Sequence, residues 1–320
     1  MVPLVSLLLL ASCLDGGTPK PTPGPGVGLN ATFVLANPGG LLALDATART
    51  LGPIVGLPPQ SAPSTPSLHP NGSSLVFALI AQPDPKRGFG SDLYTVNLDG
   101  SGLRAVVQHE SDNVFYASPR FDATGNVLYF HRRAAVIQNG SFSGNDDAIE
   151  RLDLRTGERK RLVKDGADPT ISPDGKTIVY VHLKEGQVDA LWRADIDGTN
   201  ARPLLRTSDA FWYLQAPRFA PSGCDIVLSA AGHTVTRGST GGKLAHLSIP
   251  SELFLIPCDG TSVKSVGQTF DDVVPAWSPD GSKIAYVGQG GFFVLDPKTG
   301  VIRTVAQGQD FFFGDLLWVK

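Results

Sequence analysis

Short runs of alternating apolar and polar residues recur along the chain, and each run follows a turn built from Pro, Asp or Asn, and Gly. The two sharpest copies are SPDGKTIVYV at residues 172–181 and SPDGSKIAYV at residues 278–287. A glycine turn followed by β-branched and aromatic residues at period two predicts a tight hairpin turn that leads into a strand.

Three looser copies extend this pattern into a repeat. They are HPNGSSLVFA from His69, DATGNVLYF from Asp122 and APSGCDIVLS from Ala220. The turn glycines of the five copies lie 48 to 58 residues apart; they are Gly72, Gly125, Gly175, Gly223 and Gly281. A period of about 50 residues with four strands per unit is typical of a β-propeller.

A second hairpin motif gives the number of blades. It occurs six times, as ALDATAR from Ala43, VNLDGSG from Val96, RLDLRTG from Arg151, ADIDGTN from Ala194, IPCDGTS from Ile256 and VLDPKTG from Val294. The first turn motif occurs only five times, and its sixth copy is missing because one blade is expected to be split between the two ends of the chain. Residues 315–320 then supply its innermost strand, followed by 32–36, 41–45 and 51–55. The sequence therefore predicts an all-β, six-bladed propeller of four-stranded antiparallel blades, closed by the two termini.

Composition agrees with one packed all-β domain over residues 29–320. The chain has 320 residues, 42% of them hydrophobic and 18% charged, with a formal net charge of −3. No cluster of Lys and Arg is present, so nucleic acid is not an expected partner. The oligomeric state stays open, with a monomer as the expectation.

The first 28 residues predict export and anchoring. Residues 1–12 form a short apolar run that fits the core of a signal peptide and is too short to span a bilayer. The run ends in Leu-Ala-Ser-Cys, which resembles the bacterial lipobox and predicts lipidation of Cys13. Residues 13–28 are rich in Pro and Gly and predict a flexible tether. We expect a protein of the bacterial cell envelope, held at a membrane by lipid and facing the periplasm or the cell surface.

The SPDG copies and their looser relatives resemble the WD40-type Pro-Asp repeats of the TolB β-propeller family. The resemblance covers residues 32–320, nearly the whole expected mature chain. It implies a six-bladed propeller of the cell envelope that acts by binding another protein. Similar propellers also serve as substrate gates of serine peptidases and as scaffolds of polysaccharide lyases.

The loop lengths divide the predicted propeller into two faces. The short glycine turns connect strands 1 and 2, and strands 3 and 4, and therefore share one face. The loops between strands 2 and 3, and those between blades, share the other face, which we call the long-loop face. Its expected long loops are residues 81–91, 132–147 and 231–251. Function is expected on this face, because binding residues concentrate in loops held by a rigid scaffold.

Aromatic residues and arginines gather in the segments between blades, next to the expected channel. Such residues anchor protein interfaces, although aromatics at these positions can also pack between blades as core. The candidate contact residues are Phe115, Tyr116, Phe211, Trp212, Tyr213, Phe270, Phe311, Phe312 and Phe313, with Arg120 and Arg218 at the channel mouth. Four nearby aspartates either pair with these arginines or cap turns; they are Asp112, Asp209, Asp271 and Asp310.

No catalytic or metal-binding motif is present in the sequence. There is no HExxH, paired CxxC or GxSxG pattern, and no loop has the oxygen spacing of a calcium site. His131 and His182 occupy equivalent positions in two repeats, which we attribute to the repeat rather than to a shared metal. We expect no cofactor, no metal and no enzymatic activity.

Two cysteines fall at ends of neighbouring expected strands. Cys224 opens strand 2 of its blade, and Cys258 closes strand 3, so the two ends meet on the short-turn face. In an oxidising compartment these positions predict a Cys224–Cys258 disulfide, with two free buried thiols as the alternative.

The sequence as a whole predicts a non-enzymatic scaffold that binds an envelope protein through the long-loop face. The alternative is a propeller that binds or processes a carbohydrate or small molecule in its channel. A third possibility is a purely structural envelope protein.

Overall fold

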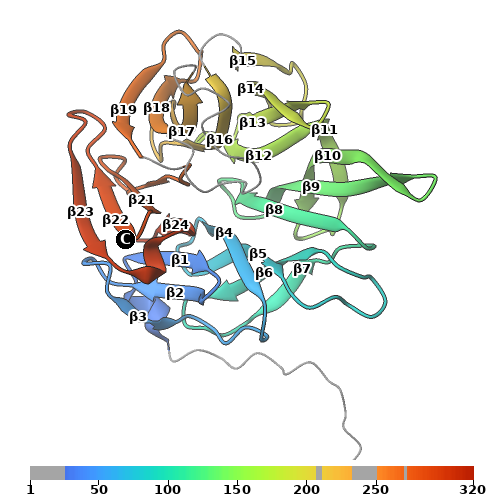
Figure 1. Cartoon of the computed structure of the whole chain (residues 1–320), viewed down its shortest axis with the longest axis horizontal. Helices are drawn as coiled ribbons and strands as arrows, with labels where there is room; N and C mark the ends of the chain where they lie inside the picture. Colours follow the sequence, from blue (N-terminus) through green and yellow to red (C-terminus); the bar gives the residue numbers. More distant parts are fainter. Residues whose placement is uncertain (1–25, 207–210, 233–250, 270–271) are drawn as a thin grey trace, which may run out of the picture.

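The computed structural model describes residues 26–206, 211–232, 251–269 and 272–320, without the side chains of Arg206 and Trp212. Its strands form six four-stranded antiparallel sheets arranged in a ring (Figure 1). The chain is therefore a six-bladed β-propeller, which confirms the predicted fold class. In the described part of the chain the helical segments are two 3-10 turns, η1 Val27–Asn30 and η2 Gln309–Phe311. None of its helices is both apolar and long enough to span a lipid bilayer.

Each blade runs from an innermost strand at the channel to an outermost strand at the rim. The split blade consists of β24 Asp315–Trp318, β1 Phe33–Asn37, β2 Gly40–Leu44 and β3 Thr50–Pro53. The second blade consists of β4 Ala62–Leu68, β5 Ser74–Ile80, β6 Ser91–Asn97 and β7 Arg104–Val107. The third blade consists of β8 Val114–Phe121, β9 Val127–Gln138, β10 Ser141–Asp153 and β11 Arg159–Lys164.

The other three blades follow in chain order around the ring. The fourth consists of β12 Gly166–Ile171, β13 Thr177–Lys184, β14 Gln187–Asp195 and β15 Arg202–Arg206. The fifth consists of β16 Phe211–Phe219, β17 Asp225–Gly232, β18 Glu252–Pro257 and β19 Lys264–Gln268. The sixth consists of β20 Ala276–Trp277, β21 Ile284–Gly288, β22 Gly291–Leu295 and β23 Ile302–Gln307.

The two ends of the chain close the ring as the sequence predicts. Strand β24 pairs antiparallel with β1, with Trp318 opposite Phe33 and Asp315 opposite Ala36. The last strand of the chain thus becomes the innermost strand of the first blade. This pairing protects both terminal strands, which would otherwise present unpaired edges.

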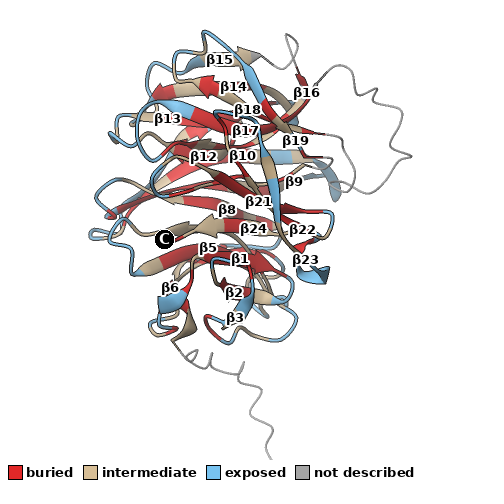
Figure 2. Ribbon diagram, turned by 90° about the vertical axis from the view of Figure 1, so that its left-hand side faces the viewer, coloured by how far each residue is buried: buried red, intermediate tan, exposed pale blue. Residues whose placement is uncertain are grey.

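The hydrophobic core lies in the wedges between neighbouring blades. Each buried apolar cluster combines residues of two adjacent blades. In β5, Leu75 and Phe77 pack toward the split blade, whereas Val76 and Ala78 pack toward the third blade. A strand buried on both faces needs apolar residues at every position, which explains the continuous apolar runs after the glycine turns. Figure 2 shows this burial along the middle strands.

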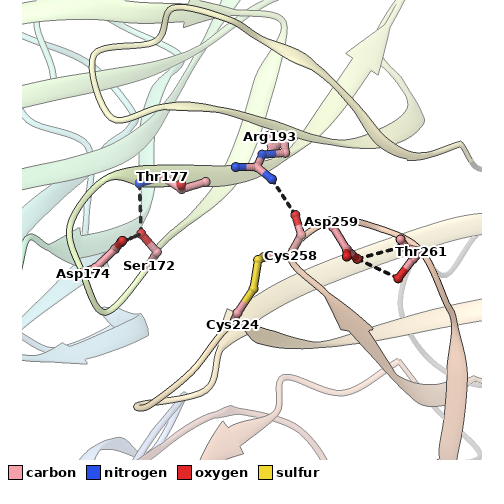
Figure 3. Close-up of a disulfide and its surroundings, with 8 residues drawn as sticks. All are labelled: Ser172, Asp174, Thr177, Arg193, Cys224, Cys258, Asp259 and Thr261. Atoms are coloured by element: carbon pink, nitrogen blue, oxygen red, sulfur yellow. Dashed lines mark hydrogen bonds between the residues drawn. A yellow bond between two sulfur atoms is a disulfide. The ribbon is translucent and has the colours of Figure 1, made fainter.

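The SPDG turns owe their shape to side-chain hydrogen bonds. The Ser172 hydroxyl accepts the backbone N–H of Thr177 at 2.9 Å and lies 2.6 Å from an Asp174 oxygen (Figure 3). Gly175 has φ 69°, a left-handed conformation that glycine adopts without steric cost. Ser278, Asp280 and Gly281 repeat the arrangement. These turns are structural and tie strand 1 of a blade to strand 2.

Cys224 and Cys258 form a disulfide in the fifth blade, the pair that the sequence analysis expects. Their Cα atoms are 5.2 Å apart and the bond joins the start of β17 to the end of β18 (Figure 3). Arg193 of the neighbouring blade donates to the carbonyl oxygen of Cys258 at 2.8 Å. The bond thus lies on the short-turn face, next to the contact between the fourth and fifth blades.

One expected loop is in fact a long β-hairpin. Strands β9 and β10 continue through residues 132–147 and protrude beyond the ring (Figure 1). The hairpin turns at Asn139 and Gly140, with φ of 51° and 76°. Asn-Gly is a preferred pair for two-residue hairpin turns, so local turn chemistry extends both strands. The expected loop 231–251 lies mostly outside the described residues.

Candidate functional site

Four innermost strands share a bulge at a residue that precedes proline. These residues have φ between 47° and 49°; they are Thr65, Ser118, Asp168 and Ala216. The pairing with strand 2 shifts register at each of them. A left-handed conformation is unusual for residues other than glycine, and for a β-branched residue such as Thr65 it is an outlier. Strain of this kind concentrates at functional sites, and here it surrounds the channel.

Hydrogen bonds between blades link the bulge positions into an arc around the channel. The Asp315 carboxylate accepts the N–H of Thr65 at 2.6 Å, and the Thr65 hydroxyl accepts the N–H of Ser118 at 3.0 Å. The Ser118 side chain hydrogen-bonds to Asp168, which accepts the N–H of Ala216 at 2.7 Å. Ala216 has no side-chain acceptor, so the arc stops at the fifth blade.

Two arginines and two aspartates face one another inside the channel. Arg218 contacts Asp168 at 3.2 Å. Although burial opposes ionisation, Arg218 and Arg120 outweigh it and hold the pKa of Asp168 below its usual range. Burial, reinforced by Arg218, lowers the pKa of Arg120 to about 9. The Nε atom of Arg120 is buried without a hydrogen-bond partner. The four formal charges sum to zero, but the fold does not stabilise them equally: it favours ionised Asp168 and disfavours charged Arg120.

Asp315 is the aspartate of this group whose charge the fold disfavours. Its burial raises the pKa of the carboxyl group, even though it accepts the N–H of Thr65 and faces Arg218 and Arg120. Asp168 adds repulsion of like charge. The surroundings of Asp315 therefore compensate the charge of its ionised form only in part. A buried carboxyl with a perturbed pKa in a concave site is a candidate functional group.

A pocket of about 380 Å³ opens beside Asp315, where the arc of hydrogen bonds is interrupted. Its walls come from the fifth, sixth and split blades at the long-loop face. They combine the polar residues Gln215, Asp272 and Asp315 with apolar and glycine residues; these are Val273, Val274, Val287, Gly288, Phe312, Phe313 and Gly314. The pocket is thus an apolar hollow at the channel mouth with carboxylates on its wall.

Phe312 and Phe313 form the exposed rim of this pocket, with 44% and 54% of their surface accessible. The rim segment is fixed to the β21–β22 turn, because Gly290 donates to the carbonyl oxygen of Phe311 at 3.1 Å. Gly314 has φ 147°, and a Cβ atom there would lie 2.8 Å from Leu35 Cδ1. The two exposed rings are therefore held in place by a backbone that requires glycine.

Three of the predicted contact residues are core residues, which corrects the expectation that they meet a partner. Tyr116, Phe211 and Phe311 are 1%, 3% and 6% exposed. Their rings lie in the wedges between blades. Tyr116 also hydrogen-bonds to Glu110 and accepts from Arg159 at 2.5 Å. Phe270 and the side chain of Trp212 lie outside the described residues.

The other predicted residues lie at or below the channel mouth. Tyr213 is half-buried and donates to Gln215 Oε1 at 2.7 Å, so it supports the pocket wall. Phe115 is half-buried and contacts Phe89 edge to face, with 5.4 Å between ring centroids. Arg120 and Arg218 lie on innermost strands, and both are half-buried.

The nearby aspartates and histidines have local partners. Asp112 accepts the N–H of Phe89 at 2.8 Å and fixes the loop before β6. The backbone carbonyl of Asp310 accepts from Asn37, and Asp209 and Asp271 lie outside the described residues. His131 and His182 pair with different aspartates, Asp147 at 2.7 Å and Asp189 at 3.1 Å. Among the described residues, His, Cys, Asp and Glu form no group of three or more that could hold a metal.

Sequence reasoning did not find Asp168, Asp315, Gln215 or Asp272. One signal was available: Thr65, Ser118, Asp168 and Ala216 precede a proline at the same distance from the next glycine turn. An X-Pro pair repeated inside an expected strand indicates a bulge, since proline cannot donate to the sheet ladder. The side chain at X is then directed away from the regular pleat.

Comparisons with known proteins support the fold and leave the activity open. No protein-family model matches the sequence. The uncharacterized protein Atu1656 of Agrobacterium fabrum is 25% identical over 182 residues, 53% of this chain and 58% of that protein. TolB from Acinetobacter baumannii matches with TM-score 0.61 and 16% identity, covering 90% of this chain and 65% of TolB. The chain thus spans less than two thirds of either protein.

The chain shares the TolB propeller fold. An oligogalacturonate lyase in complex with manganese also matches, with TM-score 0.50 and 14% identity over 90% of this chain and 85% of the lyase. Proteins of different function therefore have this architecture, and at such low identity the likeness shows the fold alone. Function has to be argued from the site.

Proposed function

We propose that the protein is a non-enzymatic, lipid-anchored scaffold of the bacterial cell envelope that binds a protein partner through its long-loop face. The anchor is Cys13, which lies outside the described residues together with the signal peptide and most of the tether. The binding surface surrounds the channel mouth.

The observation that supports this proposal is the distribution of exposed phenylalanines. Among the described residues the most exposed ones are Phe89, Phe142, Phe312 and Phe313, between 40% and 63% accessible. All four lie on the long-loop face: Phe89 in the β5–β6 loop, Phe142 on the β9–β10 hairpin, and the pair before β24. Exposed aromatic side chains are enriched in protein interfaces and dominate their binding energy.

The protruding hairpin adds a second apolar element to this face. Ile137 and Phe142 are directly paired across β9 and β10 and are 56% and 63% exposed. Exposed apolar side chains are common when scattered singly, but here two of them face each other near the tip of a hairpin. The hairpin, which projects outward from the third blade, thus presents a second apolar surface to a partner bound on this face (Figure 1).

Capture of partners from envelope membranes tests the proposal. The bait is the full chain, compared with a Phe312→Ala/Phe313→Ala variant and with a Val263→Ala/Val301→Ala control. Val263 and Val301 are exposed on the opposite, short-turn face. We expect a partner that the wild type and the control retain and the phenylalanine variant loses. Equal loss by both variants would count against the long-loop face.

A small molecule or carbohydrate bound at the channel mouth is the second candidate. The pocket of about 380 Å³ favours it, because ligand pockets occupy about 300–1,000 Å³. Phe312 and Phe313 could stack on a sugar ring while Gln215 and the carboxylates bind hydroxyl groups. A screen of neutral and acidic sugars by thermal shift separates this candidate from a scaffold, which gains no stability from any sugar.

A further inference from the structure

The pocket at the channel mouth is lined by acidic and neutral residues but by no basic residue. The residues that line it include two carboxylates and one amide, and no Lys, Arg or His is among them. The rest of its wall is aliphatic or aromatic. Such a pocket complements a ligand that has an apolar stem and a positively charged end.

From this geometry we infer that the pocket receives a lysine or arginine side chain presented by the protein partner. The inference rests on the proposed function and names the chemistry that the channel mouth recognises. The aliphatic stem of the side chain would lie against Val273, Val274 and Val287, and its charged end would reach Asp315 and Asp272.

Electrostatics at the bottom of the pocket favour a cation. Burial raises the pKa of Asp315, so ionised Asp315 lacks full compensation from the fold. Arg218 and Arg120 face it and favour its charge, whereas Asp168 opposes it. Arg218 is itself engaged with Asp168 at 3.2 Å. When Asp272 is counted with these four groups, three carboxyl groups face two guanidinium groups, and an incoming cation would supply a third positive partner.

The rim of the pocket provides a second attraction for the same group. Phe312 and Phe313 are exposed beside the carboxylates, and aromatic faces attract guanidinium and ammonium groups. The ring of Phe312 rests on the β21–β22 turn, where a Cβ atom at Gly290 would lie 3.2 Å from Phe312 Cε2. The ring is thus held in position before a ligand arrives, which reduces the entropy lost on binding.

The arc of bulge residues explains why the pocket forms at this point. From the split blade to the fourth blade, polar side chains fill the channel wall and bond to the next blade. In the fifth and sixth blades the corresponding positions are Ala216 and Val274, which offer no hydrogen-bonding side chain. The bulge positions therefore leave the channel open on this side, where Gln215 and Asp272 are the polar groups and Gln215 donates to Asp272 at 3.3 Å.

A metal ion fits this pocket less well than an organic cation. Calcium takes six to eight oxygen ligands, whereas the pocket walls carry two carboxylates and one amide among apolar side chains. An ammonium or guanidinium group can bond to the carboxylates while its stem covers the valines.

Binding of capped amino acids to the full chain tests the inference. The probes are N-acetyl-lysine methylamide, N-acetyl-arginine methylamide and, as neutral and acidic controls, the norleucine and glutamate analogues. Binding is followed by amide NMR shifts, with the Gly288, Gly290 and Gly314 signals as reporters of the pocket. We expect the two cationic probes to bind about three- to tenfold tighter than norleucine and to lose this advantage at high salt.

Variants of the two pocket carboxylates test whether these groups cause the preference for a cationic probe. Asp315→Asn keeps an oxygen that can accept the N–H of Thr65, so it removes the charge and retains the hydrogen bond. Asp272→Asn is the second variant. The matched control is Asp165→Asn, because Asp165 lies on the same face, away from the pocket, and its φ of 55° suits asparagine. We expect both pocket variants, and not the control, to abolish the preference for a cation.

The outcomes separate this inference from the proposed function. Equal binding of norleucine and lysine, or a preference for glutamate or for a sugar, would overturn the cationic site. If the partner of the wild type is lost with Phe312→Ala/Phe313→Ala but kept with Asp315→Asn and Asp272→Asn, the scaffold stands and the cationic site falls.

Discussion

The carboxylate of Asp315 accepts the backbone N–H of Thr65 at 2.6 Å, across 250 positions of sequence. This bond joins the last strand of the chain to the second blade, and the same pattern continues through Thr65 and Ser118. A similar bond runs from Ala216 to Asp168. The channel wall is thus a series of contacts between blades, in which the side chain at one bulge satisfies the backbone at the next.

Asp168 and Asp315 should affect stability with opposite dependence on pH. The pKa of Asp168 is lowered in the fold, so its ionised form is stabilising above its unfolded pKa of about 3.9, and that stability is lost as the pH falls. The pKa of Asp315 is raised, so its contribution is most favourable at low pH and declines as the pH rises through the raised value. The two carboxylates therefore differ in the sign of their linkage to folding.

Denaturant unfolding of Asp168→Asn and Asp315→Asn between pH 3 and pH 8 measures this difference. Relative to the wild type, Asp168→Asn should lose stability as the pH rises, and Asp315→Asn should gain it. The Asp165→Asn control should follow neither trend. Parallel pH profiles for the two channel variants would show that the assignment of charges in the channel is wrong.

Truncation of Asp168 should be severe. Asp168→Ala removes the acceptor of the Ala216 N–H and leaves Arg218 and Arg120 without their carboxylate. Breaking a buried ion pair by removal of one partner costs about 3–5 kcal/mol. Thermal unfolding should therefore show a loss of several degrees for Asp168→Ala and a smaller loss for Asp168→Asn. A change of less than about 1 kcal/mol would mean that channel water replaces the carboxylate.

The disulfide should contribute measurably to stability. Cys224 and Cys258 are separated by 34 positions, and closing a loop of this size constrains the unfolded chain. The expected loss in a Cys224→Ser/Cys258→Ser variant is about 2–4 kcal/mol. Alkylation without reductant, followed by mass spectrometry, should find neither thiol accessible in the wild type after unfolding. Two alkylated cysteines in protein isolated from its native compartment would contradict the prediction.

Cys13 should decide where the protein resides. In the proposed function a lipidated Cys13 holds the propeller at a membrane, and bilayer attachment through acyl chains is strong only when more than one chain is present. Cys13→Ser should move the protein from the membrane fraction to the soluble fraction without altering the unfolding of the propeller. A membrane-bound Cys13→Ser variant would show that another segment or a partner supplies the attachment.

The sequence predicts the blades well because their signals are local. A turn glycine such as Gly175 and the apolar run that follows it lie within ten residues. The bonds that shape one SPDG turn also lie within it, as for Ser172 and Thr177. The second hairpin motif occurs six times, which predicts six blades and therefore one split blade, in which β24 completes the sheet of β1 to β3.

The site was harder to predict because its contacts cross between blades. Asp168 meets Ala216 and Arg218, about 50 positions away, and Asp315 meets Thr65 from the other end of the chain. The repeated X-Pro pair marks Asp168 as a bulge position, but no local pattern marks Asp315 or identifies the partners of either aspartate. Aromatic content was also ambiguous: Tyr116 and Phe313 stand in similar segments, but one fills a wedge and the other is exposed.

Site-specific photo-cross-linking tests the central claim most directly. A photoreactive phenylalanine analogue replaces Phe89, Phe142 or Phe313 on the long-loop face, and Val263 or Val301 on the short-turn face, in cells that make the protein natively. The account predicts a discrete cross-linked product, with one and the same partner, from the three long-loop positions and from neither control. A partner cross-linked from Val263 or Val301, or no product at any long-loop position, would contradict it.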